Sequence, residues 1–249
     1  MARATLAVLL AAGAGTRLRP LTDTLPKCLL EIGGRTLLDY QLQALARHGI
    51  EDILVVTGHG AEEIQRRTAG RLRTTHNPDY ASTNNLHSLW AARREFAGRD
   101  FLCLHADLLF HPDILAPCLA SPADVTVVLD RALVEETMKA RVEGDEVLEI
   151  GKNIPREKMF GTFPGIARFS PAASAALPAV LHTMAEKAEY RNAYFTACLP
   201  ELKARGFPAK YTLTGGLPWA EIDSKADWEH ARLDVFPKLS PVYSPARRA

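Results

Sequence analysis

The 249-residue sequence lacks an excess of charge, a cysteine framework and any long apolar run. Its 30 Lys and Arg residues stand against 29 Asp and Glu, and the net charge of +1 argues against a nucleic-acid-binding surface. No apolar stretch approaches the ~20 residues of a bilayer-spanning helix, so we expect no membrane partner. The hydrophobic fraction of 47% is that of a globular domain, which excludes intrinsic disorder.

The few cysteines indicate the compartment in which the protein works. There are four, without a Cys-x-x-Cys pair and without histidines at zinc-finger spacing: Cys28, Cys103, Cys118 and Cys198. Isolated thiols in a chain of this length are typical of a reducing environment. The sequence therefore predicts a cytoplasmic protein without a disulfide framework.

The N-terminal residues superficially resemble a secretory signal, because Arg3 precedes an apolar run and the small residues 13–15. The same residues would also form a buried strand that leads into a glycine loop. The following segment, with Arg17 and Pro26-Lys27, has a phosphate-binding pattern that cleavage near Gly15 would destroy. We therefore expect a strand and reject the signal peptide.

Strand-like and helix-like segments alternate through the first ~110 residues. Strands are predicted at 5–11, 52–57, 72–76 and 101–105, and Thr36 with Asp39 forms a capping box at the start of a helix. This order predicts an α/β fold with a doubly wound, mostly parallel sheet, whose ligands bind at the carboxyl ends of the strands.

The second half of the chain has a different character. Its predicted elements are strands at 125–129, 165–169 and 210–214, a hairpin at 139–150, helices at 172–190 and 194–204, and a last helix capped by Ser224 and Asp227. We expect a small lobe of hairpin and helices, within a single domain over 1–239. Residues 240–249 are predicted to be a mobile tail.

The most informative local pattern is the small-residue loop from Leu10 to Leu18. Small residues after a strand allow the backbone to approach an anion closely. A dinucleotide fingerprint would need glycine in place of Leu18, and the Gly-Lys-Ser/Thr of a Walker A loop is absent. Arg17 and Lys27 place two cations beside the loop, which suits a polyphosphate.

Three segments resemble a known family. Residues 10–18 with Pro26-Lys27-Cys28-Leu29 resemble the signature loop of the sugar nucleotidyltransferase superfamily. Residues 83–90 (TNNLHSLW) and 219–223 (WAEID) are similar to those of its small CTP-dependent cytidylyltransferases, which act on phosphocholine, 2-aminoethylphosphonate and related phosphonates. The resemblance runs from Leu6 to about Leu233. It implies a Rossmann-like nucleotidyltransferase fold, with nucleotide bound by residues 1–110 and acceptor by 111–239.

The resemblance also implies roles for individual residues. Arg17 would steady the β- and γ-phosphates and Lys27 would face the α-phosphate, while Asp107 and Asp223 would hold Mg²⁺. Without the resemblance, an Asp after a strand, such as Asp107, is more often a turn or helix-capping residue than a metal ligand. The implied nucleotide-binding residues are Leu10, Ala12, Gly13, Ala14, Gly15, Thr16, Asn84, Asn85, Ser88 and Ala106. The paired asparagines also suit an ordinary N-cap.

The implied acceptor site contains Lys152, Thr162, Arg191 and Glu221. Lys152 resembles a second catalytic lysine that contacts the acceptor's phosphoryl group, although an exposed loop lysine would look the same. Thr162 stands near a position where amine-binding relatives carry an acidic residue. Its neutrality favours an anionic acceptor such as phosphonoformate. The alternative is a neutral substitution, with an amine bound in another way, for example by aromatic faces.

Together these features predict a Mg²⁺-dependent cytidylyltransferase that transfers CMP from CTP to a small phosphonate or phosphate monoester and releases pyrophosphate. No protein nucleophile is needed, because the acceptor oxygen is already anionic. Alternatives are a phosphocholine or 2-aminoethylphosphonate cytidylyltransferase, a sugar-1-phosphate nucleotidyltransferase that uses another NTP, and a nucleotide-binding regulatory module without activity. The resemblance also makes a homodimer possible.

Overall fold

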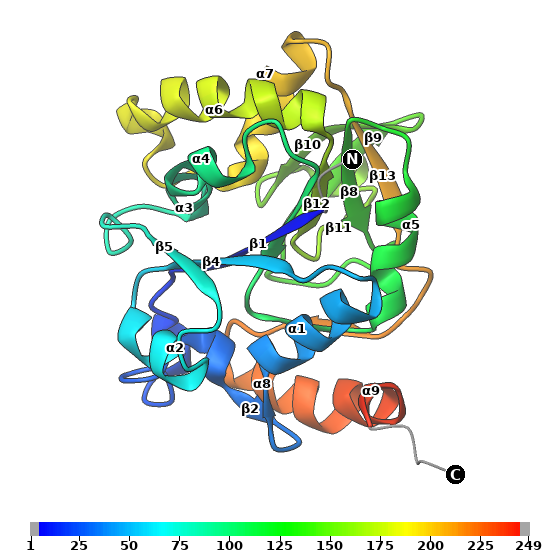
Figure 1. The fold of residues 1–249 in the computed structure, drawn as a ribbon. Coiled ribbons are helices and arrows are strands. Elements are labelled where there is room, and N and C mark those ends of the chain that lie inside the picture. Colours follow the sequence, from blue (N-terminus) through cyan, green and yellow to red (C-terminus); the bar gives the residue numbers. More distant parts are fainter. Residues whose placement is uncertain (1–4, 245–249) are drawn as a thin grey trace.

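The computed structural model describes residues 5–244, and its first strand, β1 (Leu6–Ala11), lies inside a ten-stranded sheet. Every side chain of β1 is buried. Leu6, Val8 and Leu10 join a core cluster that includes residues of the helices on one face, whereas the alternate residues join a second cluster on the other face. Helices therefore cover both faces of the sheet (Figure 1), which explains why the strand is apolar throughout.

The first half of the chain forms the parallel part of this sheet. The neighbouring strands are, in order, β6 (Phe101–His105), β1, β4 (Asp52–Thr57) and β5 (Arg73–His76). All three pairings are parallel, so the carboxyl ends of these strands meet at one edge. The predicted doubly wound, mostly parallel α/β fold is confirmed.

The second half of the chain extends the same sheet, so its predicted hairpin is continuous with the first half. Strand β12 (Ile166–Phe169) pairs antiparallel with β6 and leads to the remaining strands. These are β8 (Val125–Leu129), β13 (Ala209–Leu213), β10 (Glu146–Gly151), β9 (Lys139–Glu143) and β11 (Gly161–Thr162). The predicted hairpin is β9–β10, and β13 ties it to β8 without a break in the hydrogen bonding.

The α-helices within residues 5–244 are α1 (Leu37–Arg47), α2 (Ala61–Arg67), α3 (Asn85–Ala91), α4 (Arg93–Phe96), α5 (Leu115–Ala120), α6 (Pro171–Ala185), α7 (Leu199–Ala204), α8 (Lys225–His230) and α9 (Phe236–Tyr243). The capping boxes at Thr36 of α1 and Ser224 of α8 are both formed. Within residues 5–244, every helix falls short of the length and apolar character needed to cross a membrane.

Two short ladders lie outside the main sheet, and one of them carries the functional edge. Strand β7 (Leu108–Phe110) follows β6 directly and pairs antiparallel with β14 (Trp219–Glu221). Strands β2 (Glu31–Ile32) and β3 (Arg35–Thr36) form the other ladder. The β7–β14 ladder brings residues that are far apart in sequence to the carboxyl end of β6.

The predicted mobile tail is wrong for its first residues. Helix α9 continues through residue 240 to Tyr243, whose side chain is buried and packs edge-on against Tyr40 with ring centroids 4.8 Å apart. The Tyr243 hydroxyl donates a hydrogen bond of 2.6 Å to the carbonyl of Phe110 at the end of β7. This buried contact outweighs the turn-like proline and serine composition. Residues 245–249 lie outside the described residues.

We predict that Tyr243→Phe lowers the free energy of unfolding by about 1–3 kcal/mol, because it leaves the buried Phe110 carbonyl without this partner. Urea unfolding followed by circular dichroism measures the change. Tyr190→Phe is the matched control, since its hydroxyl makes no hydrogen bond within residues 5–244 and its loss should change stability little. Equal stability of the Tyr243 variant and the wild type would contradict a structural role for α9.

Candidate active site

The glycine loop after β1 forms one wall of a cavity of about 220 Å³ at the carboxyl edge of the parallel strands. Gly15 has φ +59°, in the left-handed region that favours glycine, and its carbonyl accepts a hydrogen bond of 2.7 Å from the buried Thr22 hydroxyl. A Cβ atom on Gly13 would meet only open space. The backbone of this loop is therefore both fixed and accessible to a ligand.

Lys27 lines this cavity and forms ion pairs with both predicted metal ligands. Its ammonium nitrogen, Nζ, is 2.8 Å from Oδ2 of Asp107 and 2.5 Å from Oδ1 of Asp223. Arg17 reaches the other oxygen of Asp223 at 2.7 Å. The structure thus brings together four of the residues on which the predicted chemistry depends, from the loop, the end of β6 and the end of β14.

These contacts shift the protonation equilibria strongly. Burial lowers the pKa of Lys27, but the two carboxylates raise it by more, so that it lies well above its ordinary value. Burial raises the pKa of Asp223, but Lys27 and Arg17 lower it by more. Both groups are therefore charged at neutral pH. Burial, followed by the charge of Asp107, raises the pKa of the neighbouring Cys28 thiol to about 12, which leaves it unreactive as a nucleophile.

Helix α1 supports the turn that carries Asp107. The buried Gln41 donates hydrogen bonds from Nε2 to the carbonyls of His105 (3.0 Å) and Leu108 (2.9 Å), one on each side of Asp107. Sequence reasoning missed this residue, because the helical pattern of α1 marks the position as inward-facing without indicating a polar role. Oδ1 of Asp107 is buried and has no hydrogen-bond partner among residues 5–244.

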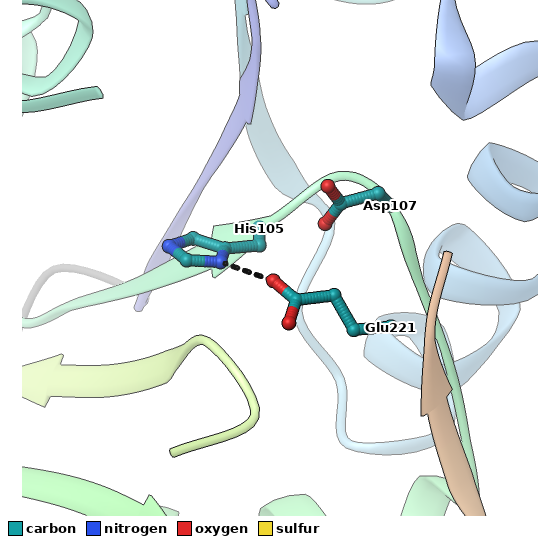
Figure 2. Close-up of side chains that lie close together, drawn as sticks. All are labelled: His105, Asp107 and Glu221. Atoms are coloured by element: carbon teal, nitrogen blue, oxygen red, sulfur yellow. Dashed lines mark ion pairs between the residues drawn. The ribbon is translucent and has the colours of Figure 1, made fainter. Parts of the chain in front are cut away.

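A second missed residue is His105, the last residue of β6. Its Nδ1 lies 3.5 Å from Oε1 of Glu221, and Asp107 projects from the same turn (Figure 2). One ligand atom from each of these three side chains lies within 4.8 Å of the others. Burial lowers the pKa of His105 and the carboxylates around it raise it by more, whereas burial chiefly raises the pKa of Glu221. The sequence signal that could have revealed His105 is a polar residue at the end of a strand that is otherwise apolar.

The predicted nucleotide-binding residues divide between two adjoining cavities. Leu10, Gly13, Gly15, Asn84, Asn85 and Ala106 line the one that contains Lys27. A smaller cavity of about 80 Å³ is lined by Ala12 and Ser88, and also by Leu10, Gly13, Asn84 and Asn85. Ala14 and Thr16 line neither. Asn84 caps α3, as its alternative interpretation predicted, and the buried Ser88 hydroxyl accepts a hydrogen bond of 3.1 Å from Asn77.

The predicted acceptor-binding residues are only partly brought together. Glu221 lines the central cavity. Lys152 does not line it, but its Nζ lies 5.9 Å from the ring centroid of Tyr194, a lining residue. Thr162 is fully buried outside the cavity: its hydroxyl donates to the Ala132 carbonyl and accepts from the Val134 amide. Arg191 is exposed outside the cavity and donates to the Ser82 carbonyl at 3.0 Å.

The resulting site presents cations and carboxylates to the same small volume. Arg17 and Lys27 beside the glycine loop could bind an anion, and Asp107 and Asp223, which both face Lys27 Nζ, could hold a cation. Such a site can hold a polyphosphate together with a divalent cation. The cavity has the volume for part of a nucleotide, and residues from both halves of the chain line it.

Comparisons with known proteins identify relatives of this chain. A CMP-5'-(3-aminopropyl)phosphonate synthase from Streptomyces rubellomurinus is 30% identical over 246 residues, which cover 93% of this chain and 39% of the relative. The chain thus spans well under half of that protein's length. A CTP:phosphoglutamine cytidylyltransferase from Campylobacter jejuni is 24% identical, with 90% of this chain and 97% of the relative covered.

A solved structure supports the fold. The inositol-1-phosphate CTP transferase from T. maritima has a TM-score of 0.80 at 20% identity, covering 97% of this chain and 98% of the other. The family model of the MobA-like NTP transferase domain matches residues 7–149, more than half of the chain, including the glycine loop, Lys27 and Asp107. The chain belongs to the family of MobA-like NTP transferase domains, within the sugar nucleotidyltransferase superfamily that its loop resembles.

Proposed function

We propose that the protein is a Mg²⁺-dependent cytidylyltransferase that transfers CMP from CTP to a small phosphonate or phosphate monoester. An acceptor oxygen forms a bond to the α-phosphorus, and the bond from that phosphorus to the bridging oxygen of pyrophosphate breaks. The observation that carries this proposal is the cluster of Lys27 and Arg17 with Asp107 and Asp223 at the glycine loop. The names of the Streptomyces and Campylobacter relatives support the choice of CTP. A cytoplasmic homodimer stays a prediction.

In this proposal Lys27 and Arg17 supply the charge stabilisation. The triphosphate would lie along the loop amides, with Arg17 on the outer phosphates and Lys27 at the α-phosphate. Negative charge that develops on the departing pyrophosphate would then face two fixed cations in a partly buried site. No base is required, because the attacking oxygen is already ionised. The unreactive Cys28 thiol agrees with direct transfer rather than a covalent enzyme intermediate.

The carboxylates fit a divalent cation. Asp107 and Asp223 both lie within hydrogen-bond distance of Lys27 Nζ, so they face one point, and the buried Oδ1 of Asp107 has no other partner among residues 5–244. Carboxylate oxygens are the ligands that Mg²⁺ prefers, completed by water and phosphate oxygens. Bound there, the ion would supply Lewis-acid stabilisation of phosphate charge. Asp107 and Asp223 would hold it, and Lys27 would move toward the phosphate.

The first candidate acceptor is a small anionic phosphonate such as phosphonoformate. Lys152 beside the lining residue Tyr194 and the cations of the loop support it, whereas the buried Thr162 does not. A specific observation favours a second candidate, an acceptor that carries an amine. A cavity of about 80 Å³ adjoins the site at Glu221 and is also lined by Glu135 and Glu136. Negative charge there would attract an ammonium group.

Pyrophosphate release with Mg²⁺ tests the reaction and its acceptor. We predict release with CTP and a small phosphonate or phosphate monoester, and little with glucose-1-phosphate or with UTP, ATP or GTP. The acceptors to compare are phosphonoformate, 2-aminoethylphosphonate and phosphocholine. A preference for phosphonoformate supports the anionic acceptor and a preference for an amine supports the acidic cavity. Binding of CTP without turnover of any acceptor would contradict the proposed activity and favour a regulatory module.

We predict that Lys27→Ala lowers kcat about 100-fold to 1,000-fold, because a fixed cation at the developing phosphate charge is lost. Initial rates of pyrophosphate release measure the effect. Lys238→Ala, which removes an exposed lysine from α9, serves as the control and should retain wild-type rates. Retention of more than a tenth of the wild-type kcat by the Lys27 variant would count against the assigned role.

Binding of Mn²⁺ as a probe, followed by electron paramagnetic resonance without nucleotide, tests the cation site. We predict that Lys27→Ala tightens Mn²⁺ binding about tenfold or more, because it removes the ammonium group between two carboxylates. Asp107→Asn should weaken it by a similar factor. Asp145→Asn, at the exposed hairpin turn, is the control and should have no effect. Unchanged affinity in both site variants would mean that these carboxylates hold no divalent ion.

A further inference from the structure

Hydrogen bonds and aromatic contacts hold His105 on several sides. Its backbone N–H donates to the carbonyl of Gly165 at 2.9 Å, and its carbonyl accepts from Gln41 at 3.0 Å. The rings of Phe163 and Phe195 meet the imidazole edge-on, with centroid distances of 6.0 and 5.7 Å and interplanar angles of 85°. Both the backbone and the ring plane of this histidine are thereby fixed.

The glycine at residue 165 makes room for this ring. A Cβ atom there would lie 2.5 Å from Cγ and Nδ1 of His105, and the residue has φ +95°, where a side chain would be strained. Two independent requirements therefore specify glycine at this position. The packing leaves the two ring nitrogens as the parts of His105 that contact polar side chains.

The direction of the hydrogen bonds around His105 follows from Asn85. The Phe195 amide can only donate, and it does so to Oδ1 of Asn85 at 2.7 Å. The Asn85 amide nitrogen must therefore point the other way, where it lies 3.1 Å from Nε2 of His105. Nε2 thus accepts, and the ring proton belongs on Nδ1, which faces Glu221 at 3.5 Å (Figure 2).

We propose that His105 is a positioning residue that links the nucleotide side of the site, through Asn85, to the acceptor side, through Glu221. This inference rests on the proposed function. The chain of contacts starts at the Phe195 amide and passes through Asn85 and His105 to the carboxylate, so it joins the start of α3, the end of β6 and the end of β14. His105 itself does not have to touch the reacting atoms. It sets the direction of two side chains that line the cavity.

Two substitutions separate the contact of His105 with Asn85 from its contact with Glu221. The amide of an asparagine can occupy the place of Nδ1, so His105→Asn keeps a donor toward Glu221 and loses the contact with Asn85. The longer side chain in His105→Gln can reach the place of Nε2, so it keeps an acceptor for Asn85 and loses the contact with Glu221. If His105 only filled space, both variants would have the same consequences.

The test measures CTP affinity by calorimetry without acceptor, and then KM for the acceptor and kcat. We expect His105→Asn to weaken CTP binding about threefold to tenfold, the worth of one hydrogen bond, with a smaller change in the acceptor KM. His105→Gln should leave CTP affinity within about twofold and raise the acceptor KM or lower kcat by about threefold to tenfold. The proposal would be overturned if the two variants changed CTP affinity, acceptor KM and kcat in the same way, or if neither variant changed them.

Variants on either side of the histidine keep the test valid if a His105 variant fails to fold. Asn85→Ala should reproduce the loss of CTP affinity, and Glu221→Gln should reproduce the acceptor defect. In the double variant of His105→Gln with Glu221→Gln, the two effects should be less than additive. Full additivity would overturn the link. CTP affinities can be compared even if no acceptor is turned over. Absence of turnover would refute the proposed function, and the CTP affinities of the His105 variants would still test the contact between His105 and Asn85.

Discussion

The contact of one lysine with two aspartates is the constraint around which the site is arranged. Asp107 and Asp223 would repel each other at the sheet edge, and Lys27 Nζ neutralises both at 2.8 and 2.5 Å. Their side chains are only 15–20% exposed, so water screens this charge weakly and an unpaired charge there would be costly. The surrounding structure must therefore hold three groups in register. The capping box of α8 contributes directly, because Asp227 accepts a hydrogen bond from the Asp223 amide as well as from Ser224.

The same charged groups can first neutralise one another and then bind ligands. Within the cluster the two carboxylates neutralise the lysine and the arginine, so these four residues together carry no large unpaired charge. A triphosphate would compete with Asp223 for Arg17 and would draw Lys27 toward its own oxygens. The carboxylates would then lose their internal partners and favour a divalent cation. Under the proposed function, nucleotide and metal therefore stabilise each other's binding through residues of this chain, which is coupling without a distant conformational change.

Much of the fold could be predicted because its signals are local. Alternating elements, apolar strands and the capping boxes at Thr36 and Ser224 depend on residues within a few positions of one another. The continuity of the second half with the main sheet depends on β13 pairing with both β8 and β10, and such long-range pairings have no sequence period of their own. The end of helix α9, residues 240–243, could not be predicted because the burial of Tyr243 depends on Tyr40 and Phe110, which are distant in sequence.

The site shows the same division between local and distant information. Motifs located Arg17, Lys27, Asp107 and Asp223, but their contacts depend on the short β7–β14 ladder, which the sequence did not reveal. The position of Thr162 suggested a substrate contact, whereas its hydroxyl binds the loop at 132–134. Gln41 and His105 escaped notice because each acts through neighbours. Charged groups that stabilise a reaction must be carried by a fixed backbone. Here the buried Gln41, which belongs to none of these motifs, fixes the turn that carries Asp107.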